Sequence, residues 1–262
     1  MLDMLVAQAP IFLLVAVRCF ALIRTLPLLS VQAVPRIARV ALAGYIAFLV
    51  LPRAISAGWV VEPYSLTYLL LLIGEALIGI ITGFYITLIF ATFSSAGQFF
   101  TFQMGFGASQ VYDALSQVEN PIMGQYLNLV ATLMFLQSGG FQKLFLGGVF
   151  RSFESISAFT LVAQRQEFMN FLLGGLTELF LAGMLMALPI VGTLFLISVS
   201  MGILSKAAPQ MNLLSEGLPT TILVAFLLLM YLLPILCDAF IHVFDRGFAS
   251  LETLLIRVGK PL

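Results

Sequence analysis

Charged residues are so sparse in this sequence that they divide the chain into long apolar runs. The longest uncharged stretch covers residues 76–112. A helix needs about 20 apolar residues to cross a bilayer, and none of the runs alternates as the strands of a membrane barrel do. The sequence therefore predicts an all-α chain with about six apolar helical segments. The runs cover residues 10–29, 38–57, 66 onward, 126–150, 168–204 and 217–244.

The composition excludes most soluble functions. Apolar residues make up 61% of the chain and charged residues 9%, where a soluble domain carries about 25% charged residues. The zero net charge provides no field to attract nucleic acid. Cys19 and Cys237 are too few for a disulfide framework, and His242 alone cannot form a metal site. Asp3 stands where a signal peptide would have basic residues, so no removable signal peptide is expected.

Catalytic and cofactor-binding motifs are absent from the sequence. It contains no Ser/His/Asp set, no glycine-rich phosphate loop and no zinc-ligand spacing, so no enzyme activity, cofactor or metal is predicted. The basic residues between the runs also fail to mark one side clearly as the inside, which is unusual for a multi-pass protein. Some runs are therefore expected to bury themselves against protein and not lipid.

Small residues recur every fourth position in the third run. The stripe consists of Gly79, Gly83, Thr87, Ala91 and Ser95. A spacing of four follows one packing ridge of a helix, and small residues allow a neighbouring backbone to approach closely. Gly183 and Ala187 repeat the pattern in the fifth run. Packing within the chain and contact with other subunits both fit this spacing.

An aromatic and glycine-rich stretch ends the same run. Gly105 and Gly107 flank Phe106, so the backbone there can adopt turns that are closed to other residues. A mobile apolar loop of this kind suits a pore constriction, which blocks water and ions by dewetting. An ordinary loop tucked into a helical core is the alternative.

Among the charges inside the apolar runs, three qualify as intramembrane charges: Arg18, Glu75 and Glu178. Each costs about 2.5–3.5 kcal/mol at mid-membrane on insertion scales. They could line a water-filled path, relay protons or pair with a partner's charge. Alternatively, they are paired or snorkelling residues with a structural role.

A polar corner between the fifth and sixth runs carries a family resemblance. Its residues Lys206, Pro209, Gln210 and Asn212 lie in the stretch Lys-Ala-Ala-Pro-Gln-Met-Asn. In its order of motifs the chain resembles the FliR/SctT family, the single-copy export-gate components of flagellar and virulence type III secretion systems. The resemblance is closer to the flagellar branch. The further motifs that fit are Arg18, Pro27, Pro35, Arg39 and Pro52; Gln103, Met104, Gly105, Asp113 and Pro121; and Phe135, Leu136, Gly139, Gly140, Ser152 and Phe153.

The resemblance implies a non-enzymatic subunit without cofactors in a helical, cone-shaped complex. Its partners would be two other export-gate membrane proteins in several copies each, other basal-body proteins and unfolded export substrates. The complex would belong to the bacterial inner membrane, within the flagellar basal body. Residues 1–167, with the central loop 103–121, would resemble the first partner, and 168–262 a helical hairpin like the second. By position, the channel plug would be formed by Met104, Gly105, Phe106, Gly107, Ala108, Ser109, Gln110, Val111 and Tyr112.

Two alternatives to the flagellar export gate remain open. The equivalent subunit of a virulence injectisome is the nearer one. A small-molecule permease would use Arg18, Glu75 and Glu178 as an intramembrane site, but permeases often show paired halves with broken helices, and no convincing halves appear in the sequence.

Overall fold

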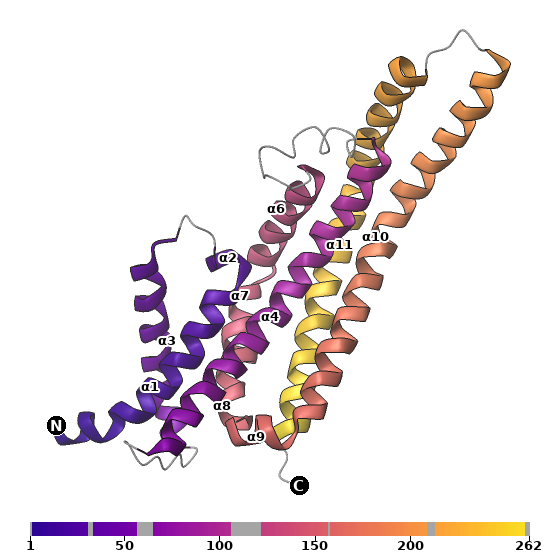
Figure 1. Cartoon of the computed structure of the whole chain (residues 1–262). Helices are drawn as coiled ribbons and strands as arrows, with labels where there is room; N and C mark the ends of the chain where they lie inside the picture. The colour runs from indigo at the N-terminus through magenta and orange to yellow at the C-terminus, as the bar shows by residue number, and fades with distance from the viewer. Residues whose placement is uncertain are drawn as a thin grey trace. The chain divides into compact units, whose positions relative to one another are not determined.

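A computed structural model describes residues 2–30, 34–56, 65–105, 122–156, 158–208 and 213–259. Within these ranges every regular element is a helix, which confirms the all-α prediction. Figure 1 shows the elements in chain order. They are α1 (Leu2–Thr25), α2 (Pro27–Ser30), α3 (Arg36–Ser56), α4 (Leu66–Gln103), α6 (Ile122–Gln137), α7 (Gly140–Gln142), the π-helix η1 (Lys143–Phe150), α8 (Arg151–Ser155), α9 (Ala158–Ala163), α10 (Arg165–Ala207), the π-helix η2 (Leu213–Gly217) and α11 (Leu218–Gly259).

Five of the predicted runs form helices long and apolar enough to cross a membrane, within Gln8–Thr25, Arg36–Ser56, Leu66–Gln103, Arg165–Ala207 and Ser215–Val258. The fourth run differs from its prediction as one segment over 126–150. Its first helix, α6, ends at Gln137, and Gly139 then takes a left-handed conformation with φ 68°. Because glycine reaches positive φ without a steric penalty, the Gly139–Gly140 pair interrupts the run, and the chain continues in the short elements α7, η1 and α8.

The chain folds into two compact units. Unit 1 comprises Met1–Ile89, Gly139–Leu176 and Phe244–Leu262, and unit 2 comprises Phe90–Ser138 and Thr177–Val243. The long helices α4, α10 and α11 contribute residues to both units. This division follows contacts within the chain. The division at 167/168 concerned likeness to partner proteins and stays a prediction.

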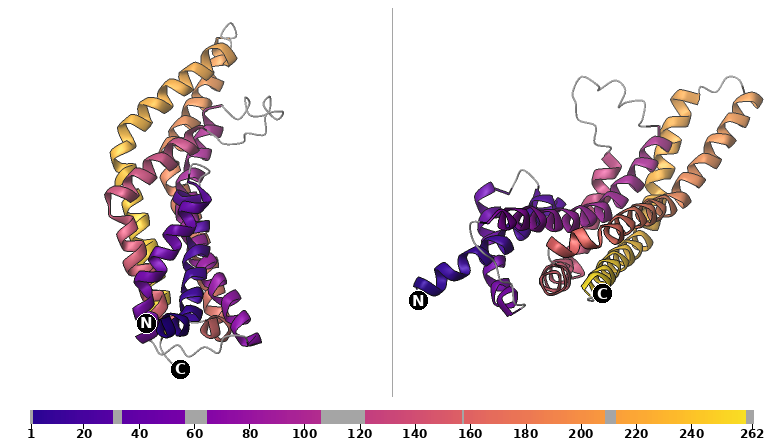
Figure 2. Two further views of the ribbon diagram at one scale, coloured as in Figure 1. Left: turned by 90° about the vertical axis from the view of Figure 1, so that its left-hand side faces the viewer. Right: turned by 60° about the horizontal axis from the view of Figure 1, so that its bottom comes forward.

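Unit 1 packs its helices closely around buried side chains. Its α1 and α3 lie side by side (Figure 2). Its apolar core joins Ile156, which follows α8, to residues from α4, the start of α10 and the end of α11. Helical periodicity allows each of these helices to turn one apolar stripe inward. The members of this core are Ile78, Ile156, Phe168, Leu254, Leu255 and Val258.

Two ion pairs connect η1 and α8 of unit 1 to the last part of α11. Lys143 Nζ lies 2.6 Å from Asp245 Oδ1, and Arg151 pairs with Glu252. The basic residues are eight positions apart, whereas the acidic residues are seven apart. A π-helix bonds residue i to residue i+5, so each of its hydrogen bonds spans one residue more than in an α-helix and its turns are wider. The wide turns of η1 therefore bring both basic residues into register with one face of α11.

Unit 2 packs mainly through aromatic rings and close helix contacts. Phe93 and Phe240 are both fully buried, with ring centroids 4.3 Å apart. Gly97 of α4 lies so close to α6 that an added Cβ would stand 2.5 Å from the Met123 carbonyl oxygen. Thr177–Ala207 of α10 and Leu218–Val243 of α11 run in opposite directions (Figures 1 and 2). Unit 2 is therefore held together largely by apolar packing.

Candidate functional site

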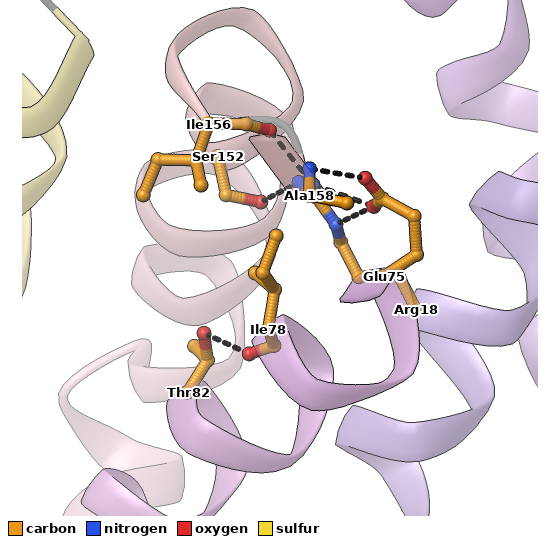
Figure 3. Close-up of polar contacts among 7 residues, drawn as sticks. All are labelled: Arg18, Glu75, Ile78, Thr82, Ser152, Ile156 and Ala158. Atoms are coloured by element: carbon orange, nitrogen blue, oxygen red, sulfur yellow. Dashed lines mark hydrogen bonds and ion pairs between the residues drawn. The ribbon is translucent and has the colours of Figure 1, made fainter. Parts of the chain in front are cut away.

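Two of the three predicted intramembrane charges meet in the interior of unit 1. Arg18 of α1 is 2% exposed and Glu75 of α4 is fully buried. The Arg18 Nε donates a hydrogen bond of 2.6 Å to Glu75 Oε2, and Nη2 lies 2.6 Å from the same oxygen. Figure 3 shows the two side chains pointing toward each other from neighbouring helices. Arg18 and Glu75 therefore form a buried ion pair within the chain.

The interrupted backbone between α8 and α9 supplies the other polar partners of this pair. Arg18 Nη2 donates to the Ile156 carbonyl oxygen at 2.7 Å, and Nη1 donates to Ser152 Oγ at 3.2 Å. The Ala158 backbone N–H donates to Glu75 Oε1 at 3.2 Å (Figure 3). We call these five residues the Arg18–Glu75 cluster: Arg18, Glu75, Ser152, Ile156 and Ala158.

Glycines of α4 bring the surrounding backbone close enough for these contacts. A Cβ at Gly79 would overlap the Arg18 carbonyl oxygen, and one at Gly83 would overlap the Thr25 hydroxyl. One turn further on, Thr87 Oγ1 donates to the Thr25 carbonyl oxygen at 2.9 Å. The first half of the predicted small-residue stripe therefore packs against α1 of the same chain.

The second half of that stripe has a different environment, in unit 2. Ala91 is exposed and Ser95 is half-buried. The related pair in the fifth run lies closer to other residues: a Cβ at Gly183 would stand 3.0 Å from the Thr92 carbonyl oxygen, and Ala187 is buried. The described part of the chain therefore leaves Ala91 exposed and covers Ser95 only in part.

Glu178, the third intramembrane charge, is exposed on the part of α10 that belongs to unit 2. It does not belong to the Arg18–Glu75 cluster.

The predicted plug begins where α4 ends. The helix ends at Gln103, Met104 is buried and Gly105 adopts φ 83°, a conformation that favours glycine. The Gly105 N–H donates to the Phe102 carbonyl oxygen at 3.2 Å. The remaining predicted plug residues lie outside the described residues: Phe106, Gly107, Ala108, Ser109, Gln110, Val111 and Tyr112.

The polar corner is described only at its first residue. Lys206 is exposed in the last turn of α10, which ends at Ala207. A cation there interacts favourably with the carbonyl end of a helix. Pro209, Gln210 and Asn212 lie outside the described residues.

Long apolar faces of α10 and α11 in unit 2 remain uncovered. The share of buried residues is 28% and 17% in the spans of these two helices, against 39% in the span of α4. Contiguous exposed apolar surface of this kind marks contact with a membrane or with other proteins. The open apolar faces carry Phe180, Leu181, Leu185, Leu188, Phe195 and Leu196 on α10, and Leu223, Phe226, Leu227, Met230, Tyr231 and Ile235 on α11.

The sequence identified the buried charges Arg18 and Glu75, but it did not identify the groups that bind them. The serine, the carbonyl group and the amide that complete the Arg18–Glu75 cluster carry no distinctive sequence signal. Gly74 and Gly97 also make close helix contacts, yet they fall outside the four-residue spacing of the stripe. In the described part of the chain, no group of three or more His, Cys, Asp and Glu residues could hold a metal ion.

A shallow pocket of about 250 Å³ lies between η1 and α11 of unit 1. Its charged lining residues include Lys143 and Asp245, which already pair with each other. The pocket therefore presents paired charges and not a set of free ligand-binding groups.

These features define an all-helical protein of the membrane class, with a polar cluster satisfied inside the chain and long open apolar faces. The chain belongs to the bacterial export proteins, family 1, which match residues 9–247. This confirms the family resemblance drawn from the sequence.

Named relatives cover most of the chain. It is 32% identical to the flagellar biosynthetic protein FliR of Bacillus subtilis, over 95% of this chain and 96% of the relative. It is 31% identical to FliR of Borreliella burgdorferi, over 75% and 74%, and 28% identical to FliR of Escherichia coli, over 91% and 90%.

Proposed function

We propose that this chain is a structural, non-enzymatic subunit of the flagellar type III protein-export gate. The observation that carries the proposal is the family match across residues 9–247, together with relatives of nearly the same length that are named flagellar biosynthetic proteins. The long apolar helices support a place in the bacterial inner membrane, within the flagellar basal body. Energy for export would come from other components, because the sequence has no nucleotide-binding loop.

The subunit assembles with other membrane proteins through the open apolar faces of α10 and α11. Leaving such faces in water would cost about 25 cal/mol for each Å² of apolar surface. The partners in this proposal are the two export-gate proteins implied by the family resemblance, in several copies each, with this subunit present once. Unfolded flagellar proteins pass through the channel that the assembly encloses.

The segment from Met104 to Tyr112 closes the channel before export begins. The proposal is supported by the end of α4 at Gln103 and by the left-handed turn at Gly105, where an added Cβ would stand 2.5 Å from Leu218 Cδ2. A bulky apolar residue held behind such a turn can block ions by excluding water. Phe106 is the residue assigned to this seal.

The first experiment tests the assembly. A strain that lacks the chain should lose swimming motility and export of flagellar proteins, and the intact gene should restore both. Gentle detergent extraction followed by native mass measurement should find the chain in a complex with several copies of two other proteins, and the chain purified alone should aggregate. A well-behaved monomer in detergent, with motility unchanged in the deletion strain, would contradict the proposal.

The second experiment tests the plug. Deletion of residues 106–109 should raise ion leak across the membrane while the amount of assembled complex stays near that of the parent. Gly105→Pro should act in the same direction, because proline cannot adopt φ 83°. A four-residue deletion at 57–60, in another connecting segment, is the control. An unchanged leak in a deletion variant that assembles normally would remove residues 104–112 from the sealing role.

A further inference from the structure

We infer that Arg18 and Glu75 act as a buried clamp and not as a proton relay or ion site. The clamp supplies hydrogen bonds to the backbone groups left without helical partners between α8 and α9. The inference concerns the Arg18–Glu75 cluster alone, and only the motility measurement in its test rests on the proposed export function. It assigns a role to two charges whose purpose the sequence leaves open.

The first argument comes from the backbone. At Ile156 the chain leaves the helix with φ −127° and ψ 127°, and α9 starts at Ala158. A helix end leaves carbonyl and N–H groups without partners in the helix, and a polar group that is buried without a partner destabilises the fold. Arg18 binds the Ile156 carbonyl and Glu75 binds the Ala158 N–H. The ion pair therefore supplies one hydrogen bond on each side of the break.

The second argument comes from the burial and the polar contacts of the two side chains. Arg18 makes polar contacts through Nε, Nη1 and Nη2, and both carboxylate oxygens of Glu75 accept a hydrogen bond. The Phe153 ring lies 4.1 Å from the Arg18 guanidinium carbon and covers it from one side. A relay or ion site needs access for water or ions. The nearly complete burial of both side chains favours a structural role instead.

The third argument comes from the space around the cluster. A Cβ at Gly74, next to Glu75, would overlap the Ala158 side chain. Gly79 similarly lies against the Arg18 backbone. Two glycines of α4 therefore allow both α1 and the start of α9 to come within hydrogen-bonding reach of Glu75. This close approach on two sides suits a clamp that ties three segments of the chain together.

The test measures heat-induced aggregation of the full-length chain in detergent-solubilised membranes, together with motility per amount of protein. The variants are Arg18→Met, Glu75→Leu, the two combined, and Glu75→Gln. The control is Arg24→Gln, at an exposed position on the same helix as Arg18. It should keep the parental midpoint, which is the temperature at which half of the chain has aggregated.

The clamp predicts a graded series of midpoints. Each apolar single variant leaves a buried charge unpaired, so its midpoint should fall by about 10 °C. The combined variant should fall by less than the sum of the two single losses. It should still lie below the parent, because the Ile156 carbonyl and the Ala158 N–H both lose their partners. Glu75→Gln should lose least, because the amide oxygen still accepts hydrogen bonds, and its motility should follow the amount of protein.

Three results would overturn the clamp. The first is a Glu75→Gln chain with the parental midpoint and amount but no motility, which would assign the carboxyl group to proton or ion transfer. The second is a combined variant with the parental midpoint, which would mean that the backbone break does not need the pair. The third is a Glu75→Leu midpoint equal to that of the control.

Discussion

The two halves of the small-residue stripe on α4 have opposite environments. Gly79 and Gly83 in unit 1 lie directly against the backbone or side chains of α1, whereas Ala91 in unit 2 is exposed. The residue type and the spacing are nearly the same in both halves. A four-residue stripe of small residues therefore shows where another helix can pack closely. It does not show whether that helix belongs to the same chain.

The two units also differ in how their interiors are connected. Unit 1 contains the Arg18–Glu75 cluster and the ion pairs of η1 and α8 with α11, so its interior is connected by polar as well as apolar contacts. Unit 2 is packed by aromatic rings and exposes the open apolar faces of α10 and α11. Both units still expose apolar surface that another molecule or the membrane must cover, in unit 1 on α3 and the start of α4. The difference lies in their interiors, because only the description of unit 1 includes a buried ion pair.

The largest expected effect compares a buried position of unit 2 with a position on its open apolar face. Phe240→Ala should destabilise the chain by about 3–5 kcal/mol, because it empties a fully enclosed position against Phe93. Phe226→Ala, on the open face of α11, should cost less than about 1 kcal/mol in the chain alone but should weaken assembly with partners. Chemical denaturation in detergent measures the first quantity and co-purification the second. Equal losses of stability for both variants would mean that the open face is already packed within the chain.

The next effect compares the two halves of the stripe directly. Gly79→Ala should cost about 1–3 kcal/mol, because its Cβ overlaps the Arg18 carbonyl oxygen and the backbone of α1 must shift. Ala91→Val should leave the heat stability of the chain in detergent-solubilised membranes nearly unchanged, since Ala91 is exposed. Thermal unfolding of the two variants is the measurement. If Ala91→Val instead destabilised the chain as much as Gly79→Ala, the contrast between the halves would be wrong.

The smallest effect concerns the partly exposed ion pair between Lys143 and Asp245 in unit 1. Lys143→Glu should cost about 0.2–1 kcal/mol, because the pair with Asp245 is nearly half exposed. The double variant Lys143→Glu and Asp245→Lys should recover most of this loss at low salt, and the difference should shrink at high salt. A double-mutant cycle at two salt concentrations measures the coupling. A large coupling that is insensitive to salt would mean that the pair is shielded from water.

The fold class was predictable because it depends on hydropathy alone. Long uncharged runs fix where apolar helices form, and five of the six runs became helices of membrane-spanning length. The break in the fourth run was harder to foresee. Gly139 and Gly140 were noticed as part of a motif, but a glycine pair can also lie within a helix, and only packing decides between the two.

The site was predictable as a set of residues but not as an arrangement. Arg18 and Glu75 stood out because charges are costly in apolar runs. Their pairing joins positions 57 residues apart, and no local periodicity encodes such a contact. Ser152 and Ile156 contribute a hydroxyl and a carbonyl group, which nearly any sequence could supply at that point. Glu178 had the same sequence signature as Glu75, yet it is exposed.

The wide turns of η1 make the chain between Gly139 and Ile156 tolerant of changes in length. A π-helix holds its surplus residue within the turn, so removal of one residue would tighten η1 toward an ordinary α-helix. Lys143 would still face Asp245 from one end, and Ser152 would still reach Arg18 from the other. Sequences that differ by one residue in this stretch can therefore share the same interior, with the gain or loss absorbed locally as a change of helical pitch.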